Sequence, residues 1–179
     1  ISIDGDFSTG SSYETRLELN LHTGTHLDTP LHMVPGGYTL EKLNLSKVVT
    51  KCKLLDLTKV KDKISEKDLS TLAITEGDFI LLKTRNSFED ILETEFIYID
   101  KTGADYLINK KIKGVGIDSL GIERDQPDHE THIGLFSSDI MILEGLRLKD
   151  IEEGEYFLSA APILIPGAEA APIRAYLIK

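Results

Sequence analysis

The chain has 179 residues, of which 41% are apolar and 28% charged, and its formal net charge is −10 at pH 7. This length suffices for one domain with its own core, and no apolar run reaches the roughly 20 residues that span a bilayer. The negative charge argues against nucleic acid or an anionic membrane surface as the main partner and favours a small, non-anionic molecule.

Alternating apolar and polar residues predict a half-buried strand over residues 15–24 (TRLELNLHTG), which ends near His22. A second strand is predicted over residues 48–57 (VVTKCKLLDL). Ser65 precedes Asp68 by three residues, which indicates a helix that begins with a capped, acidic first turn. The apolar run in residues 77–84 (GDFILLKT) predicts a buried strand.

In the second half, residues 102–111 (TGADYLINKK) and 129–136 (HETHIGLF) are predicted helices. The segments GVGID and DIMILEGL are predicted strands, and two more follow in EYFLSAAPILI (residues 155–165) and APIRAYLIK (residues 171–179). We expect the last two strands to be antiparallel neighbours. The chain contains no repeat and no flexible linker, so we expect one α/β or α+β domain over residues 1–179.

The only cysteine is Cys52, which excludes an intrachain disulfide and a Cys-rich metal site and makes the cytoplasm the expected compartment. Its apolar neighbours predict a buried thiol rather than a nucleophile. The first residues do not resemble a signal peptide. Because the sequence begins at Ile1 without an initiator methionine, residues upstream are expected to be missing from it.

Residues 21–32 (LHTGTHLDTPLH) contain three of the five histidines and an aspartate, namely His22, His26, Asp28 and His32. Imidazole and carboxylate are ligands of zinc, and of manganese or iron where carboxylates are more numerous. Gly24 permits a turn, and Thr29 before a proline favours extended backbone. On an extended segment His26 and Asp28 share one face, so the pair can converge on one ion.

A second group of candidates lies more than a hundred residues away, at His129, His132 and Glu144. Glu144 follows four apolar residues in a predicted strand, where a lone carboxylate is costly to bury and a metal ion would neutralise it. The alternative is a solvated strand end or an ion pair with Arg147. The local pattern decides neither this alternative nor which of the two histidines belongs to a site.

The string His-x-Gly-Thr-His-x-Asp-x-Pro-x-His in residues 22–32 resembles the signature of the cyclase-like metal-dependent hydrolases, which include bacterial kynurenine formamidase and isatin hydrolase. The resemblance continues through GGYTLEKL, EGDFILLKT, KGVGID, HIGLFSSDIMILEGL and PGAEAAPIRA. It implies a swivelling β/β/α fold, a single domain with a mixed central sheet core, assembled as a homodimer or homotetramer.

The same resemblance implies roles for individual residues. Asp28 would bridge two ions, and His32 would be the catalytic acid and base. The family spacing of twelve residues selects His132 to pair with Glu144, and it leaves His129 unassigned. The implied metal ligands are His22, His26, Asp28, His132 and Glu144.

The implied activity is hydrolysis of a C–N amide bond in a small molecule by water that a divalent metal activates. One or two zinc ions are expected, with manganese as the alternative, and no residue is assigned to another cofactor. The alternatives are an arylformamidase acting on N-formylkynurenine and a metal-occupied binding homologue without turnover.

The substrate-lining tryptophan of kynurenine formamidases has no counterpart here, because the chain has no tryptophan and the nearest stretch is Ile3–Asp6. Phe7, Tyr13 and Phe136 are candidate aromatic walls, although packing roles are the simpler expectation. Arg124 could reach a substrate carboxylate, but a surface ion pair with Asp125 or Glu123 is the simpler expectation.

Overall fold

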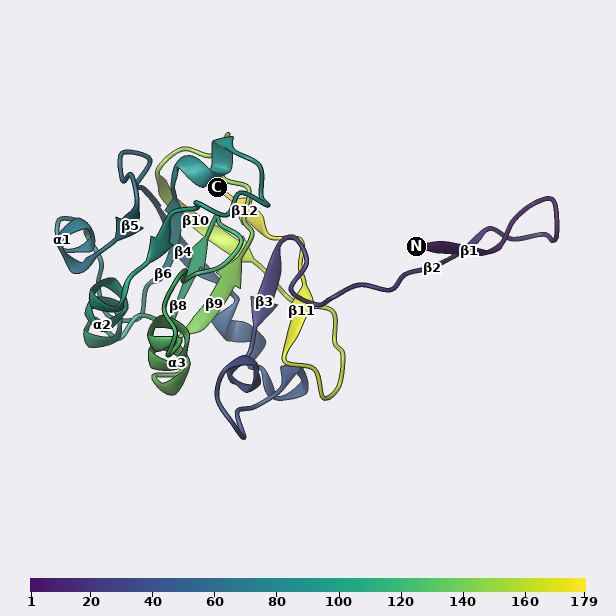
Figure 1. Ribbon diagram of the computed structural model, residues 1–179, viewed down its shortest axis with the longest axis horizontal. Coiled ribbons are helices and arrows are strands. Elements are labelled where there is room, and N and C mark those ends of the chain that lie inside the picture. The colour runs from purple at the N-terminus through teal and green to yellow at the C-terminus, as the bar shows by residue number, and fades with distance from the viewer.

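The computed structural model describes residues 1–179 and centres on an eight-stranded sheet that curls into a half-barrel (Figure 1). Its strands are β3 (His26–Asp28), β4 (Val49–Asp56), β6 (Phe79–Lys83), β8 (Gly114–Ile117), β9 (Met141–Glu144), β10 (Gly154–Ser159), β11 (Ala170–Pro172) and β12 (Tyr176–Ile178). Smaller sheets pair β1 (Ser2–Gly5) with β2 (Glu14–Arg16) and β5 (Lys63–Ile64) with β7 (Tyr98–Ile99). The helices are α1 (Glu66–Leu69), α2 (Lys101–Asn109) and α3 (Glu130–Ser137).

The large sheet is mixed, with the order β11-β3-β9-β8-β6-β4-β10-β12. The four central strands β9, β8, β6 and β4 are parallel, and the two strands added at each end are antiparallel to their neighbours. This confirms the predicted α/β class with a mixed central sheet. No helix combines the length and the apolar composition that crossing a membrane requires.

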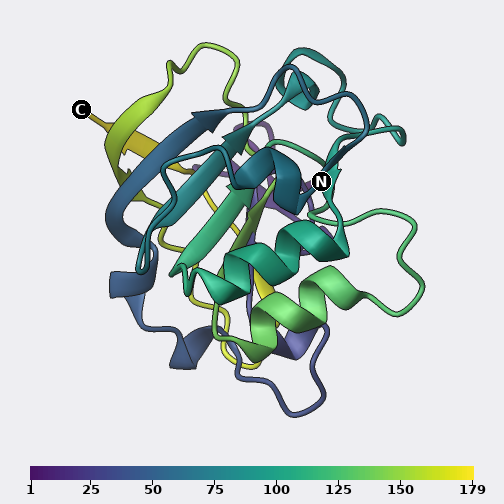
Figure 2. The same ribbon diagram turned by 90° about the vertical axis from the view of Figure 1, so that its left-hand side faces the viewer.

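The three helices pack against one face of the sheet, as Figure 2 shows. Because side chains alternate along a strand, β6 supplies both cores: Ile80 and Leu82 belong to the helix-covered core, and Phe79 and Leu81 to the core on the opposite face. Burying each such side chain contributes about 1.5–3 kcal/mol. The central strands are therefore a rigid base for residues at their ends.

Most predicted elements are confirmed. Strands β4, β6, β8 and β9 lie within the predicted ranges, and the ends of helices α2 and α3 agree with the predicted ends to within two residues. Helix α1 begins at the expected capping box of Ser65 and Asp68. Cys52 is buried in the core as predicted. Burial raises the pKa of its thiol to about 12, which suits an inert side chain.

The predicted strand over residues 15–24 is wrong. Only Glu14–Arg16 forms a strand, which pairs with β1 in a hairpin, and Leu17 and Leu19 are exposed. Their alternation has no sheet to pack against, because this segment leaves the body of the protein. His22 accordingly lies in a turn rather than at the end of a strand.

The C-terminal prediction is correct in part. Strand β10 ends at Ser159 rather than at residue 165, before Pro162, which has no backbone N–H to donate. The predicted strand over residues 171–179 divides into β11 and β12, which lie at opposite edges of the sheet. Strand β12 pairs antiparallel with β10, so the expected antiparallel pairing of the last two strands is confirmed for residues 176–178.

Candidate functional site

Strand β3 brings two of the predicted residues together. His26 and Asp28 are completely or almost completely buried, and the His26 Nε2 atom lies 3.5 Å from the Asp28 Oδ1 atom. The prediction that His26 and Asp28 share one face of an extended segment is therefore confirmed, and Thr29 is extended as expected. The register of β3 against β9 sets His26 opposite Glu144. One strand pairing thus joins two sequence segments that are 118 residues apart.

His22 reaches this strand through the predicted turn. Gly24 has a φ of +66°, a value that favours glycine. Gly145 also has a positive φ, and a Cβ atom there would lie 2.2 Å from the carbonyl oxygen of Gly24, so the backbones approach closely beside the site. The His22 Nδ1 atom lies 3.1 Å from Asp28 Oδ1, and its Nε2 atom lies 3.2 Å from Glu169 Oε1.

Glu144 lies between two histidines. Its Oε2 atom is 3.2 Å from His26 Nε2, and its Oε1 atom is 3.2 Å from the Nε2 atom of His132 on α3. The backbone N–H of Ile122 also donates to Oε1. Glu144 is only 4% exposed, and Arg147 donates to backbone carbonyls instead. The solvated strand end and the Arg147 ion pair are therefore both wrong.

Glu123 fixes the orientation of His132, a role that no pattern in the sequence predicted. Its carboxylate accepts from the Nδ1 atoms of His132 and His129, at 2.7 and 2.8 Å, and from the backbone N–H groups of Thr131 and His132. The Nε2 atom of His132 consequently faces Glu144. His129 has a left-handed backbone and is exposed, so it borders the site from outside.

His32 completes the cluster from the 3-10 turn Pro30–His32. Its ring centroid is 4.1 Å from that of His22 and 5.5 Å from that of His132, and its side chain makes no hydrogen bond within the chain. Burial lowers the pKa of His32, which favours the neutral imidazole. The structure therefore brings all six predicted residues together.

Several buried polar atoms face one another in this cluster without hydrogen bonds. They are His26 Nε2, His132 Nε2 and both carboxylate oxygens of Asp28. A buried polar atom without a partner is costly, and a shared cation would satisfy all four. Two overlapping groups have donor atoms within 4.8 Å of one another: His22, His26 and Asp28, and Asp28, His32 and His132. The residues fit a divalent metal ion.

The electrostatics agree with this arrangement. Burial lowers the pKa of His26, but the carboxylates of Glu144 and Asp28 outweigh it and raise the pKa to about 9. Burial also lowers the pKa of His132, but the carboxylates of Glu123 and Glu144 outweigh this effect and raise the pKa to about 10. Burial raises the pKa of Glu144, but His132 and His26 hold it well below its usual range. These carboxylates therefore favour positive charge on the imidazoles, and a cation would supply the same charge.

The candidate substrate residues are either exposed on the N-terminal hairpin or engaged in other contacts. Arg124 pairs with Asp62 and Asp125, at 3.2 and 3.3 Å, and its guanidinium also contacts a backbone carbonyl, so the predicted ion pair with Asp125 is confirmed. Phe7 and Tyr13 are exposed on the N-terminal hairpin. Phe136 is buried, with its ring centroid 5.9 Å from that of His132.

Comparison with known proteins identifies the family. A family model described as "Putative cyclase" matches residues 3–124. The chain belongs to the cyclase family. Cyclase-like protein 3 from Oryza sativa subsp. japonica is 32% identical over 92% of this cyclase, which spans only 65% of that relative's length. Kynurenine formamidase from Bacillus cereus is 28% identical, with 94% of this chain and 81% of that protein covered.

Solved structures agree with this assignment. One described as a potential metal-dependent hydrolase with cyclase activity has a TM-score of 0.89 and 54% identity, over 90% of this cyclase and 81% of that chain. Isatin hydrolase A from Labrenzia aggregata has a TM-score of 0.81 over 95% of this cyclase and 78% of that chain. At 21% identity, the second likeness shows the fold alone.

Proposed function

We propose that this cyclase is a metal-dependent hydrolase that cleaves a C–N amide bond of a small molecule. The observation that carries the proposal is the cluster of buried ring nitrogens and carboxylate oxygens on His26, Asp28 and His132 that make no hydrogen bond. The kynurenine formamidase relative and the structural neighbour described as a metal-dependent hydrolase support the reaction class.

The proposed metal ligands belong to two groups that share Asp28. His22, His26 and Asp28 would hold one ion, and His132 and Glu144 would hold a second ion with Asp28 as the bridge. Zinc is the proposed metal and manganese the alternative, because the donors are three imidazoles and two carboxylates. A bound divalent ion acts as a Lewis acid on a carbonyl and lowers the pKa of water toward neutrality.

Proton transfer and the positioning of His132 would be the roles of two other side chains. Burial keeps His32 neutral at pH 7, so its free ring nitrogen can accept a proton and return it to a leaving nitrogen. Glu123 would keep His132 in one orientation through the 2.7 Å contact to Nδ1. We further propose that residues 1–179 are one domain of a cytoplasmic homodimer or homotetramer.

Two kinds of amide are the candidate substrates, a formamide and a cyclic amide. The stretch Ile3–Asp6, which is the nearest counterpart of the tryptophan segment, lies in the hairpin that extends away from the body (Figure 1). This position favours a general small amide over N-formylkynurenine.

Metal content and turnover test the proposed function together. Protein purified without chelators should contain stoichiometric divalent metal, and formanilide, N-formylkynurenine or isatin should be hydrolysed. Chelation should abolish turnover, and zinc or manganese should restore it. Metal without turnover on any of these amides would favour the non-catalytic binding homologue, and absence of metal would contradict the site.

Replacing Glu123 with glutamine should weaken metal binding by about 10–100-fold, because the carboxylate that orients His132 is lost. Titration of chelator-treated protein with zinc measures this change. The matched control is Glu130→Gln, since Glu130 is exposed on α3, the helix that carries His132. Equal zinc affinities of the two variants would contradict the positioning role of Glu123.

A further inference from the structure

A cavity of about 510 Å³ lies on the face of the large sheet opposite the three helices, and its lining is mostly apolar. Leu81 on β6 and Leu158 on β10 line it and belong to the buried core on this face. The strand register sets Leu158 opposite Leu177 of β12, which also lines the cavity. Cavities that bind small molecules typically have volumes of about 300–1,000 Å³ and mostly apolar linings. This cavity therefore has the size and the lining of a small-molecule site.

The mouth of this cavity is cationic. Arg147 and Arg174 are among the lining residues, and no acidic residue is. Both arginines are exposed, and so is Tyr176, whose ring centroid lies 5.4 Å from the guanidinium carbon of Arg174. The cavity therefore combines an apolar wall with a net side-chain charge of +2, although the whole chain carries −10.

The two arginines at the mouth are the ones without a carboxylate partner. Of the five arginines in the chain, Arg16, Arg85 and Arg124 each pair with an aspartate or a glutamate. Arg147 donates only to backbone carbonyls. Arg174 makes no ion pair within the chain. Because a guanidinium group binds carboxylates through paired N–H donors, both positive charges are available to an anion from outside the chain.

The cavity is separate from the proposed metal site. Leu27 of β3 belongs to the same core as Leu81 and Leu158 of the cavity wall. Because side chains alternate along a strand, His26 and Asp28 point to the other side of β3. A molecule in the cavity would therefore lie across the sheet from these two metal ligands.

We propose that this cavity binds an amphipathic carboxylate, with its hydrocarbon chain against the leucines and its carboxylate on Arg174. A small inorganic anion would leave the apolar wall in contact with water, and a neutral hydrocarbon would leave both arginine charges without a partner. One molecule with an apolar chain and a single carboxylate satisfies both parts of the cavity. The proposal stands independently of the proposed hydrolysis and assigns no reaction to the cavity.

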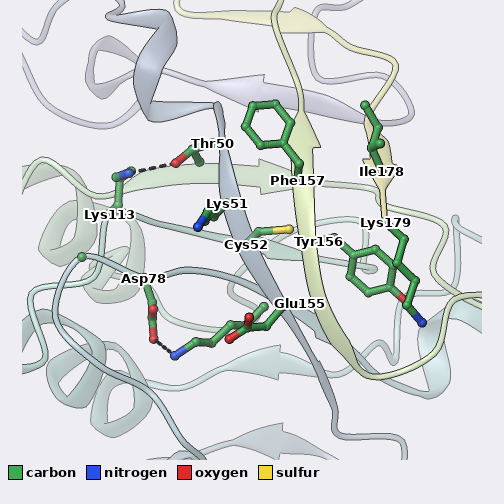
Figure 3. A pocket seen from close by; sticks show the side chains of 12 residues that line it. Thr50, Lys51, Cys52, Asp78, Lys113, Glu155, Tyr156, Phe157, Ile178 and Lys179 are labelled. Atoms are coloured by element: carbon green, nitrogen blue, oxygen red, sulfur yellow. Dashed lines mark hydrogen bonds and ion pairs between the residues drawn. The ribbon is translucent and has the colours of Figure 1, made fainter.

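A second cationic pocket provides the control for charge. It has a volume of about 610 Å³ and lies over β4, β10 and β12 (Figure 3). Four lysines line it together with Asp78 and Glu155, and Lys53 pairs with Asp78 at 2.6 Å. Lys51 in this pocket is exposed and makes no ion pair within the chain. Lys51→Gln therefore removes one positive charge outside the proposed site.

Calorimetric titration of the full-length chain with decanoate, below the concentration at which decanoate forms micelles, tests the proposal. The wild type should bind one decanoate per chain. Arg174→Gln should raise the dissociation constant at least about tenfold, which is about 1.4 kcal/mol, and Lys51→Gln should leave it unchanged. Decanol, which carries no charge, should bind equally to the wild type and to Arg174→Gln. Absence of decanoate binding, or equal decanoate affinities of the two variants, would overturn the proposal.

Two further variants locate the bound decanoate. Asp28→Asn should keep the decanoate affinity, and loss of binding there would place the carboxylate at the metal site and overturn the proposal. Ala175 is half-buried in the cavity lining, so Ala175→Phe should fill part of the cavity and weaken decanoate and decanol alike at least about tenfold. Circular dichroism checks the fold of each variant. Unchanged decanoate affinity in folded Ala175→Phe would contradict binding in this cavity.

Discussion

Asparagine in place of Asp28 should abolish metal-dependent stabilisation and lower turnover by about a thousandfold or more, which corresponds to about 4 kcal/mol. Asp28 is completely buried, both of its oxygens lack hydrogen bonds, and His22 Nδ1 and His26 Nε2 lie 3.1 and 3.5 Å from Oδ1. It is the only residue common to the two groups that could hold an ion. Loss of the Asp28 carboxylate should therefore disrupt both ion-binding positions rather than one.

The measurement is a thermal unfolding series with and without zinc. A ligand at one hundred times its dissociation constant stabilises by about 2.7 kcal/mol. For a chain of this size the wild-type Tm should rise by roughly 5–10 °C. The shift should vanish in Asp28→Asn and persist in Asp150→Asn, whose side chain is exposed. An unchanged zinc shift and unchanged turnover in Asp28→Asn would remove Asp28 from the site.

Elements with strong local patterns could be predicted from the sequence. The buried runs of β6 and β9, the capping box of α1 and the helical spacing in α2 each depend on neighbouring residues. Much of the candidate site could be predicted for the same reason, because His22, His26, Asp28 and His32 lie within eleven residues. Their proximity in the sequence was sufficient to suggest a metal.

Residues that act through tertiary contacts could not be predicted. Glu123 contacts His132 across nine residues, and Glu169 contacts His22 across 147, with no pattern that marks either acid. The pairing of His26 with Glu144 depends on strand register. Leu17 and Leu19 alternate as in a half-buried strand, and only the three-dimensional structure shows that no sheet lies beneath them.

His32→Ala should lower turnover by about 100–10,000-fold and leave the bound metal unchanged, if His32 acts as the proposed acid and base. Its side chain makes no hydrogen bond within the chain, its pKa is lowered by burial, and its ring centroid lies 4.1 Å from that of His22. A competing role exists, because His32 lies with Asp28 and His132 in a group whose donor atoms could hold an ion. In the first role, alanine at position 32 removes only the group that transfers the proton. In the second role, it removes a metal ligand.

Metal analysis and kinetics on the same preparation separate these roles. Full metal content with slow turnover supports proton transfer, because only the reacting group is missing. Loss of one ion per chain would instead make His32 a ligand and would contradict its proposed role. His129→Ala is the matched control, since this histidine is exposed and Glu123 keeps its contacts with Thr131 and His132 without it. This variant should keep both metal and most of the turnover. Because Glu123 still orients His132 in the His32→Ala variant, a change in metal content there reports on His32 itself.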